Sequence, residues 1–523
     1  MTEGDAGSEA SAAVYEEALS CLSSLITRRT RADGTNRGDQ FDLLFDYLKI
    51  LELDEAISQL KVVHVAGTKG KGSTCTFTES ILRSCGLHTG LFTSPHLIDV
   101  RERFRLDGME ISKEKFLAYF WWCWHRLREK TDDDVPMPTY FRFLTLLAFK
   151  IFIAEQVDVA ILEVGLGGKF DATNVVRTPV VCGISSLGYD HMEILGNTLG
   201  EIAGEKAGIF KQGVPAYTVP QPEEAMSVLE AKATDLGISL QVALPLDKET
   251  LGGLQLGLHG EHQYINAGLA VAISRAWLLN TRYAEEIFSN LTTNNLPEQF
   301  IRGLTLATIQ GRAQIVHDSY SVKQTSNFGL AGLVFYLDGA HSPESMAICA
   351  RWFSHAIKEN AHTVDHSTKP VHILLFNCMT VRDPHLLLPP LINTCSEHGV
   401  QFDKALFVPN LSMLNKVASQ SIPEPNPQQI DLSWQLSIKK VWENTIHRNK
   451  ELTSDKIMDV NEAFKQGEKL NTGSIENSAV FHSLPSAIRW LREHAQQNNS
   501  RCIQVLVTGS LVLVGDVLRL IKK

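Results

Sequence analysis

Short apolar runs rich in β-branched residues alternate with stretches of helical periodicity along the first 300 residues. The runs that predict buried strands are 61–67, 88–94, 157–168, 179–188 and 214–219. The stretches that predict helices are 13–26, 73–84, 198–211, 223–236, 261–279 and 283–293. Strands and helices in this alternation are typical of a doubly wound parallel sheet with helices on both faces. The pattern therefore predicts an α/β domain at 41–300, preceded by a helix and a polar connection at 1–40.

The same pattern starts again after about residue 300. The predicted strands of this second part are 331–342, 371–377, 404–409 and 503–511, and its predicted helices are 343–358 and the C-terminal segment. Between 411 and 478 the chain turns polar and rich in proline, asparagine, glutamine and lysine, with one helical stretch near 434–444. We therefore predict a smaller α/β domain at 301–523 that carries a polar insertion at 411–478.

Composition and charge narrow the class of protein. The chain has 523 residues, a formal net charge of −10 and nine cysteines, none of them in a Cys-x-x-Cys pair. This charge argues against a nucleic-acid binder, and the cysteine pattern indicates free thiols in a reducing compartment. The first residues lack the features of an organelle transit peptide, and charged residues interrupt the most apolar stretch. We therefore expect a cytosolic protein without an integral membrane segment, and a monomer.

The stretch "GTKGKGS", which follows the first predicted strand, has the composition of a phosphate-binding loop. Glycines allow successive backbone N–H groups to point at one anion, and the helix that follows adds its positive end. The loop consists of Gly67, Thr68, Lys69, Gly70, Lys71, Gly72 and Ser73. Its glycine spacing is shorter than that of the common phosphate loop. The alternative is a glycine-rich turn without a ligand.

Further candidates follow other predicted strands at the edge where ligands bind in open α/β sheets. Ser94 and Glu163 end two strands, and His191 follows a third. Each has a plainer explanation, as a turn cap, an exposed strand end or a surface histidine. Lys206 lies within a predicted helix near Glu201 and Glu205, where a solvated ion pair is the ordinary explanation.

Nine motifs in family order resemble those of the folylpolyglutamate synthases, a family of the Mur ligase superfamily. They are "HVAGTKGKGSTC", "TSPHL", "VRERFRLDG", "EVGLGG", "DATN", "GEKAGIFK", "LHGEHQYINAGLA", "LDGAHSPES" and "VTGSL". The stretch "PTYFRFLTLLAF" is similar to the eukaryotic enzymes, and the whole pattern is most similar to plant members. The resemblance implies an N-terminal P-loop domain of the Mur ligase type, which binds ATP. It also implies a smaller Rossmann-like C-terminal domain that acts as the glutamate ligase.

The resemblance implies ATP-dependent addition of L-glutamate, through γ-linked amide bonds, to the glutamate tail of tetrahydrofolates by way of an acyl phosphate. Lys71, Glu163, His191 and Lys206 are the implied catalytic residues. Two Mg²⁺ sites are implied, one at Ser94 and Glu163 and one at His191 and Lys206, with a monovalent cation as a further candidate. Because an ammonium has no lone pair for a metal, the family pattern implies a carbamylated Lys206.

The resemblance also assigns binding residues. Residues expected on the nucleotide side, besides the glycine loop, are Gln263, Asn266, Arg312 and Asp338. Residues expected near the incoming L-glutamate are His341 and Ser510. For the reduced folate the side chains themselves suggest a site, because the rings of Tyr140 and Phe141 could stack on the pterin or benzoate ring, and Arg101 and Arg103 could offer a basic face to the polyanionic glutamate tail. The arginines share one face only if their segment is extended. The alternatives are core packing for the aromatic rings, a solvated strand for the arginines, and a salt bridge between Arg312 and Asp338.

Two other functions are compatible with the sequence. Dihydrofolate synthase, alone or as a second activity, uses the same chemistry with dihydropteroate as the acceptor. A non-catalytic regulator would bind ATP without incorporating glutamate. The joint presence of Lys71, Glu163, His191 and Lys206 argues against the regulator.

Overall fold

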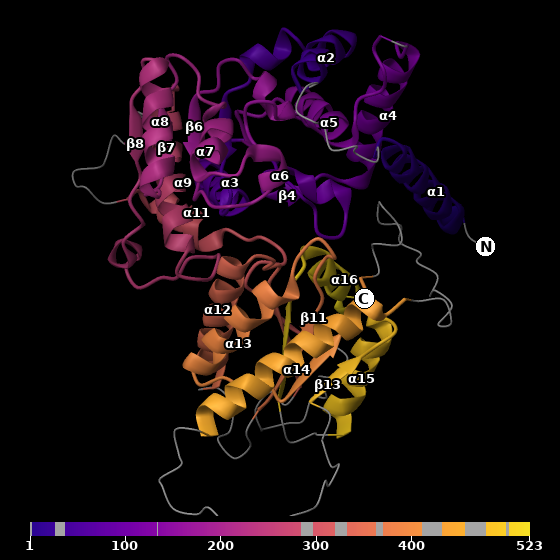
Figure 1. Cartoon of the computed structure of the whole chain (residues 1–523). Coiled ribbons are helices and arrows are strands. Elements are labelled where there is room, and N and C mark those ends of the chain that lie inside the picture. The colour runs from indigo at the N-terminus through magenta and orange to yellow at the C-terminus, as the bar shows by residue number, and fades with distance from the viewer. Residues whose placement is uncertain are drawn as a thin grey trace, which may run out of the picture. The chain divides into compact units, whose positions relative to one another are not determined.

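The computed structural model describes residues 3–26, 37–132, 134–283, 296–318, 332–361, 370–410, 431–454, 477–497 and 502–522. The chain divides between Ile309 and Gln310 into two compact units, each built on one sheet (Figure 1). The sequence pattern placed this division near residue 300. Within the described residues, no helix combines the length and the apolar character needed to cross a membrane.

The sheet of the first unit has eight strands in the order β4-β3-β2-β5-β1-β6-β7-β8. They are β1 Val62–Ala66, β2 Thr89–Phe92, β3 Phe104–Leu106, β4 Met109–Glu110, β5 Val159–Glu163, β6 Val181–Ile184, β7 Ala216–Thr218 and β8 Leu240–Val242. Strands β2 and β5 to β8 run parallel with β1, whereas β3 and β4 are antiparallel additions at one edge. The predicted parallel sheet is therefore confirmed.

Helices of the first unit cover both faces of this sheet (Figure 1). They are α1 Glu3–Ser24, α2 Arg37–Ile50, α3 Lys71–Ser84, α4 Lys113–Glu129, α5 Tyr140–Ala154, α6 Met192–Leu195, α7 Leu199–Ala207, α8 Glu223–Asp235, α9 Gln263–Leu279 and α11 Glu298–Leu306. Short 3₁₀ turns are η1 Ala56–Gln59, η2 Val100–Arg103, η3 Ala172–Val175 and η4 Lys248–Leu251. Successive residues of β1 enter different cores: Val62 packs with α4 and α5, and Val63 with α3 and α9. The predicted helix at 283–293 lies almost entirely outside the described residues.

The sheet of the second unit has six strands in the order β13-β12-β11-β14-β10-β9. They are β9 Gln314–His317, β10 Leu333–Leu337, β11 Val371–Phe376, β12 Lys404–Phe407, β13 Ser478–Val480 and β14 Ile503–Thr508. Its helices are α12 Pro343–Ala361, α13 Pro384–Glu397, α14 Ser433–Ser454, α15 Leu484–Gln497 and α16 Leu511–Ile521. Among the described strands of this sheet, β9 alone is antiparallel to its neighbour.

The helix predicted near 434–444 exists as α14, and it belongs to the core of the second unit. Ile438, Val441 and Trp442 are buried among residues of α13 and β12. The rest of the predicted insertion, at 411–430 and 455–476, lies outside the described residues.

Parallel strands bring the loops that follow them to one edge of a sheet. In the first unit the loops after β1, β2, β5 and β6 therefore approach each other. The sequence pattern extended the strand that contains β5 to residue 168. It ends at Glu163, because 164–168 forms a glycine-rich turn in which Gly167 has a φ of 70°.

Candidate active site

The glycine loop after β1 is held by its own backbone and by two neighbouring loops. Gly70 has a φ of 84° and precedes the first turn of α3. The backbone N–H groups of Thr68 and Lys69 both donate to the carbonyl of Ser186, at 3.0 Å each. These two N–H groups are therefore already bonded within the chain. The N–H groups in the first turn of α3, which lack an intrahelical acceptor, are the ones suited to an anion.

Two glycines of the loop have no space for a side chain. A Cβ atom at Gly70 would lie 2.1 Å from Oδ1 of Asn266, and one at Gly67 would lie 2.0 Å from Oγ of Ser185. Asn266 is buried and donates through Nδ2 to Oε1 of Gln263 at 2.9 Å. The structure therefore places Asn266 beside the glycine loop, and Gln263 holds its side chain.

Glu163 and Ser94 lie close together, as their positions after neighbouring strands predict. The Glu163 side chain is 4% exposed, and its Oε2 accepts a hydrogen bond from the backbone N–H of Ser94 at 2.9 Å. A Cβ atom at Gly72 would lie 3.5 Å from the same oxygen. A buried carboxylate thus lies directly beside the first turn of α3.

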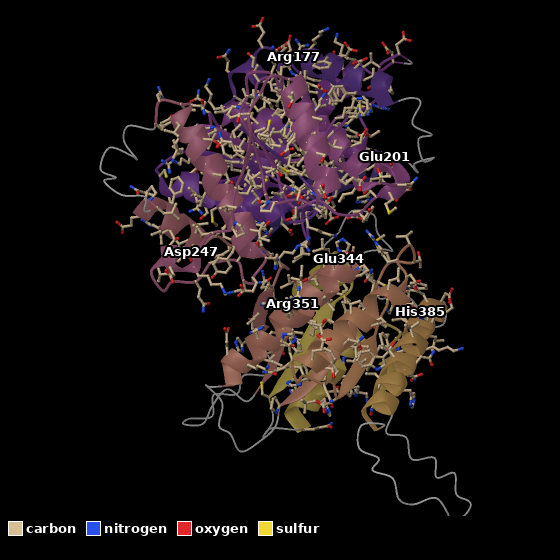
Figure 2. All side chains as sticks on the ribbon, turned by 60° about the vertical axis from the view of Figure 1, so that its left-hand side comes forward. Arg177, Glu201, Asp247, Glu344, Arg351 and His385 are labelled. Atoms are coloured by element: carbon tan, nitrogen blue, oxygen red, sulfur yellow. The ribbon has the colours of Figure 1, made fainter. Side chains whose placement is uncertain are left out.

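Lys206 lines a small pocket with Lys71 and His191. It is 5% exposed, and its Nζ donates to the carbonyl of Gly67 at 2.8 Å. Burial, reinforced by the positive charge of Lys71, lowers the pKa of Lys206 to about 7. The solvated ion pair that a helical lysine near glutamates suggests is therefore wrong for Lys206. Glu201 instead caps the start of α7 at the surface, where Figure 2 labels it.

Sequence reasoning missed Asp190, which lines the same pocket. Its Oδ2 lies 3.6 Å from Nζ of Lys69, and its Oδ1 accepts from the backbone N–H of His191 at 3.1 Å. His191 itself has a left-handed backbone, with a φ of 50°. The available signal was the "DH" pair after the third predicted strand, because an acidic residue beside a candidate ligand often orients it.

The arginine segment departs from the extended conformation considered for it. Val100–Arg103 is the 3₁₀ turn η2, because Asp99 and Glu102 cap its backbone N–H groups. Arg101 consequently turns back to pair with Asp99, with 3.1 Å between Nη2 and Oδ2. The shared basic face of an extended strand is therefore wrong.

Arg103, unlike Arg101, is buried in the first unit. It is 6% exposed, donates from Nε to Nδ1 of His96 at 2.8 Å, and lies 5.8 Å from the ring centroid of Tyr140. Burial lowers the pKa of Arg103, an effect that Tyr140 and Glu163 oppose. Phe141 has another environment, since its ring lies 5.9 Å from Phe92 and packs against the backbone of Gly165.

In the second unit, Asp338 after β10 organises a turn. Its Oδ2 accepts from the backbone N–H of Ala313 at 2.9 Å, and its Oδ1 accepts from that of Ala340 at 3.0 Å. These bonds hold the segment that carries the half-buried Arg312. The carboxylate thus has a backbone-binding role that the salt-bridge alternative did not anticipate.

His341 and Ser510 follow β10 and β14, which are neighbours in the second sheet. Nδ1 of His341 lies 2.8 Å from the carbonyl of Gly339. Ser510 is buried, and its Oγ caps α16 by accepting from the N–H of Val512 at 3.1 Å. Both residues therefore lie at the edge where ligands bind in sheets of this kind.

A second pocket, which sequence reasoning missed, follows β11 in the second unit. The cationic side chains of Arg382 and Lys440 line it, together with the carboxylate of Asp383 and the rings of His385 and Trp434. Nε1 of Trp434 donates to the carbonyl of Cys378 at 2.8 Å, which fixes α14 to the loop after β11. His385, labelled in Figure 2, is exposed at the start of α13. The pocket depends on packing between segments far apart in sequence, so no local signal indicated it.

Comparison with known proteins agrees with this arrangement. The chain is 60% identical to a folylpolyglutamate synthase of Arabidopsis thaliana, over 97% of this chain and 88% of the relative. It is 38% identical to a protein of Bos taurus named "Folylpolyglutamate synthase, mitochondrial", over 97% and 92% of the two chains. No family model matches the chain. The cytosolic location stays a prediction, since several mammalian relatives carry a mitochondrial name.

The fold has solved counterparts. The structure of a folylpolyglutamate synthase of Mycobacterium tuberculosis complexed with ADP is similar with a TM-score of 0.68 at 21% identity, over 97% of this chain and 99% of the other. The two-domain fold expected from the motifs is thereby confirmed, as is the similarity to plant relatives. The chain belongs to the folylpolyglutamate synthase family.

Proposed function

We propose that this chain is an ATP-dependent ligase that adds L-glutamate through γ-linked amide bonds to the glutamate tail of tetrahydrofolates. The observation that carries this function is the convergence of three groups at one sheet edge. They are the first turn of α3, the buried carboxylate of Glu163, and the pocket of Lys71 and Lys206. An anion-binding helix end beside a carboxylate and two amines suits transfer of a phosphoryl group to an acidic substrate.

The reaction needs ATP because a carboxylate is a poor electrophile. Attack of the terminal γ-carboxylate on the γ-phosphorus of ATP forms an acyl phosphate and releases ADP. The amino group of L-glutamate then attacks the acyl carbon, phosphate leaves with the electrons of the broken C–O bond, and the amine loses a proton. Catalysis of both steps depends mainly on positioning and on stabilisation of negative charge.

Lys71 and the first turn of α3 are the groups we assign to the outer phosphates. Gln263 and Asn266, beside Gly70, are assigned to the nucleoside side. In the second unit, Arg312 is assigned to ATP, and Asp338 holds its turn in place.

The site also fits Mg²⁺, which prefers oxygen ligands and shares its coordination sphere with phosphates and water. The Ser94 hydroxyl and the Glu163 carboxylate are such donors, beside the loop that would hold the phosphates. Among the described residues, no group of three or more His, Cys, Asp or Glu side chains could hold a metal ion. Because the protein offers few ligands here, the phosphates of ATP would have to complete the coordination of the Mg²⁺ ion. Bound Mg²⁺ would neutralise phosphate charge.

A second Mg²⁺ fits His191 and Lys206 only if Lys206 is carbamylated, since the amine offers no oxygen. Carbamylation by CO₂ requires the neutral amine, and the pKa of about 7 makes that form available near neutral pH. Mass spectrometry of the native protein should therefore find ~44 mass units added at Lys206, the mass of one CO₂. An unmodified lysine under bicarbonate at neutral pH would contradict the assignment.

We assign the folate to the region of the buried Arg103 and the half-buried Tyr140 and Phe141, with Arg101 at its margin. The guanidinium of Arg103 suits the carboxylates of a glutamate tail, and the Tyr140 ring offers an aromatic face. The incoming L-glutamate is assigned to the second unit, near His341 and Ser510. The pocket of Arg382, His385 and Lys440, which Asp383 also lines, offers the cationic side chains of Arg382 and Lys440 to the carboxylates of L-glutamate.

Incorporation of labelled glutamate, with ATP and either tetrahydrofolate or dihydropteroate, tests the function. Glutamate should be added to tetrahydrofolate, and the product length can be measured by mass. Turnover of dihydropteroate alone would establish dihydrofolate synthase instead. ATP binding without incorporation would establish the regulator. Lys206→Ala should abolish incorporation, and full activity of that variant would remove Lys206 from the mechanism.

A further inference from the structure

A buried chain of hydrogen bonds lies behind the wall of the Lys206 pocket. It begins at His64 in β1, whose Nε2 lies 2.8 Å from Oγ of Thr173 in η3. The Thr173 hydroxyl donates to Oδ1 of Asp171 at 2.6 Å. His64 and Thr173 are fully buried, and Asp171 is 5% exposed. The catalytic assignments above do not use any of these three residues.

The acceptors of Asp171 are all occupied. Its Oδ2 accepts from the backbone N–H groups of Gly165 and Leu166, and its Oδ1 accepts from the N–H of Thr173, each at 3.0 Å. With the Thr173 hydroxyl, these donors surround both oxygens. A proton on either oxygen would face another donor, so the hydrogen bonds require a carboxylate. Burial raises the pKa of Asp171, and these bonds oppose that effect.

The same donor count determines the state of His64. Since the Thr173 hydroxyl gives its hydrogen to Asp171, it must accept from Nε2–H of His64. Nδ1 of His64 has no hydrogen-bond partner among the described residues. A second proton there would be buried without an acceptor, so His64 is neutral with its hydrogen on Nε2. Burial accordingly lowers the pKa of His64 to about 3.

The far end of the chain holds a turn that shapes the pocket. Gly165 and Leu166, which Asp171 binds, line the pocket together with Lys206. Three residues further along, the N–H of Lys169 donates to the carbonyl of Glu205 at 2.8 Å. A Cβ atom at Gly168 would lie 2.8 Å from the carbonyl of Lys206, so the turn contacts α7 backbone to backbone. The turn and the helix that carries Lys206 are therefore fixed to each other.

We propose that His64 is a positioning residue of the Lys206 pocket. Its Nε2–H orients the Thr173 hydroxyl, and that hydroxyl orients the carboxylate that holds the turn of residues 165–169. Without this bond the hydroxyl can rotate, and Asp171 loses one fixed donor. The inference rests on the proposed role of Lys206, because a displaced turn matters for the reaction only if that pocket is catalytic.

Pairs of variants separate hydrogen bonding from packing. His64→Leu and Thr173→Val remove the donor or the hydroxyl, whereas His64→Gln and Thr173→Ser retain a group able to replace it. We expect the first two to lower kcat about tenfold or more, with the KM for ATP within about threefold. The second two should remain within about threefold of the native kcat. Leu127→Ala, a core truncation in α4, controls for lost stability alone.

Hydrogen exchange at the amides of Gly165 and Leu166 supplies a readout that does not depend on activity. His64→Leu and Thr173→Val should exchange there about ten times faster than the native chain, and the other variants at the native rate. The proposal is overturned if His64→Leu and His64→Gln have the same kcat and the same exchange rate, or if Thr173→Val and Thr173→Ser do. If the native chain incorporates no glutamate, the proposed function fails, and exchange alone decides whether His64 positions the turn. Should His64→Leu not fold, the Thr173 pair provides the same comparison.

Discussion

Gly70→Ala tests the shape of the glycine loop. Gly70 has a φ of 84°, a region that costs an L-residue about 1–2 kcal/mol. The new Cβ would also lie 2.1 Å from Oδ1 of Asn266, whereas ordinary contact begins at 3.4 Å. Asn266 would therefore have to retreat by about 1.3 Å, and its 2.9 Å hydrogen bond to Gln263 would break at a cost of about 1 kcal/mol. Together these effects predict a loss of about 2–3 kcal/mol.

Gly86→Ala is the matched control at the other end of α3. Gly86 has a φ of 87°, and a Cβ there would meet no heavy atom within 4 Å. It should therefore lose only the backbone contribution of about 1–2 kcal/mol and leave ATP kinetics unchanged. Gly70→Ala should lose more, and it should raise the KM for ATP at least about tenfold because the anion-binding turn starts at this residue.

Urea unfolding and steady-state kinetics measure the two effects. In an Asn266→Ala background the clash is absent, so the stability cost of Gly70→Ala should fall to that of Gly86→Ala. The reasoning is refuted if Gly70→Ala has the same cost in both backgrounds, or if its KM for ATP stays within about twofold of the native value.

Three further predictions concern charged residues. The pKa of Lys206 is about 7 in the folded state, below its ordinary value of 10.5. Burial of the charged lysine therefore lowers the free energy of unfolding most below pH 7. This loss is relieved as the pH rises from 7 toward 10.5, because the folded protein then binds fewer protons than the unfolded one. Urea unfolding should show this rise in the native chain relative to Lys206→Met, and parallel pH profiles would contradict it. Arg492→Leu should cost the second unit about 3–5 kcal/mol in thermal unfolding. The substitution removes the guanidinium whose Nη2 lies 2.8 Å from the fully buried carboxylate of Asp318. An unchanged unfolding temperature would contradict this prediction. Arg103→Gln should raise the KM for folate about tenfold or more with the KM for ATP unchanged, because its guanidinium lies beside Tyr140 in the proposed folate region. Equal changes in both constants would instead indicate a general loss of structure.

Strands with strong apolar runs were predictable from the sequence, and short ones were not. Strands β1, β5 and β11 lie within predicted runs, because burial on both faces requires continuous apolar residues. Strands β9 and β13, of four and three residues, were missed. They lie at the edges of their sheet, where pairing with one neighbour imposes little pattern on the sequence.

Conformations determined by capping were also hard to predict. Arg101 and Arg103 alternate in sequence like residues of a strand, but the carboxylates of Asp99 and Glu102 bind backbone N–H groups and produce a 3₁₀ turn. Those bonds reverse the expected geometry, so that Arg101 pairs locally and Arg103 is buried.

The sequence by itself determined the family and the parallel α/β character of the sheets, and it predicted that Ser94, Glu163 and His191 follow strand ends, since strand and loop positions follow from local patterns. Only the tertiary structure decided the burial of Lys206 and the direction of its pKa shift. Its Nζ bonds to the carbonyl of Gly67, 139 positions away in sequence, inside a pocket formed by loops after different strands. A pKa depends on the solvent and charges around the group, and for a buried side chain distant segments supply that environment.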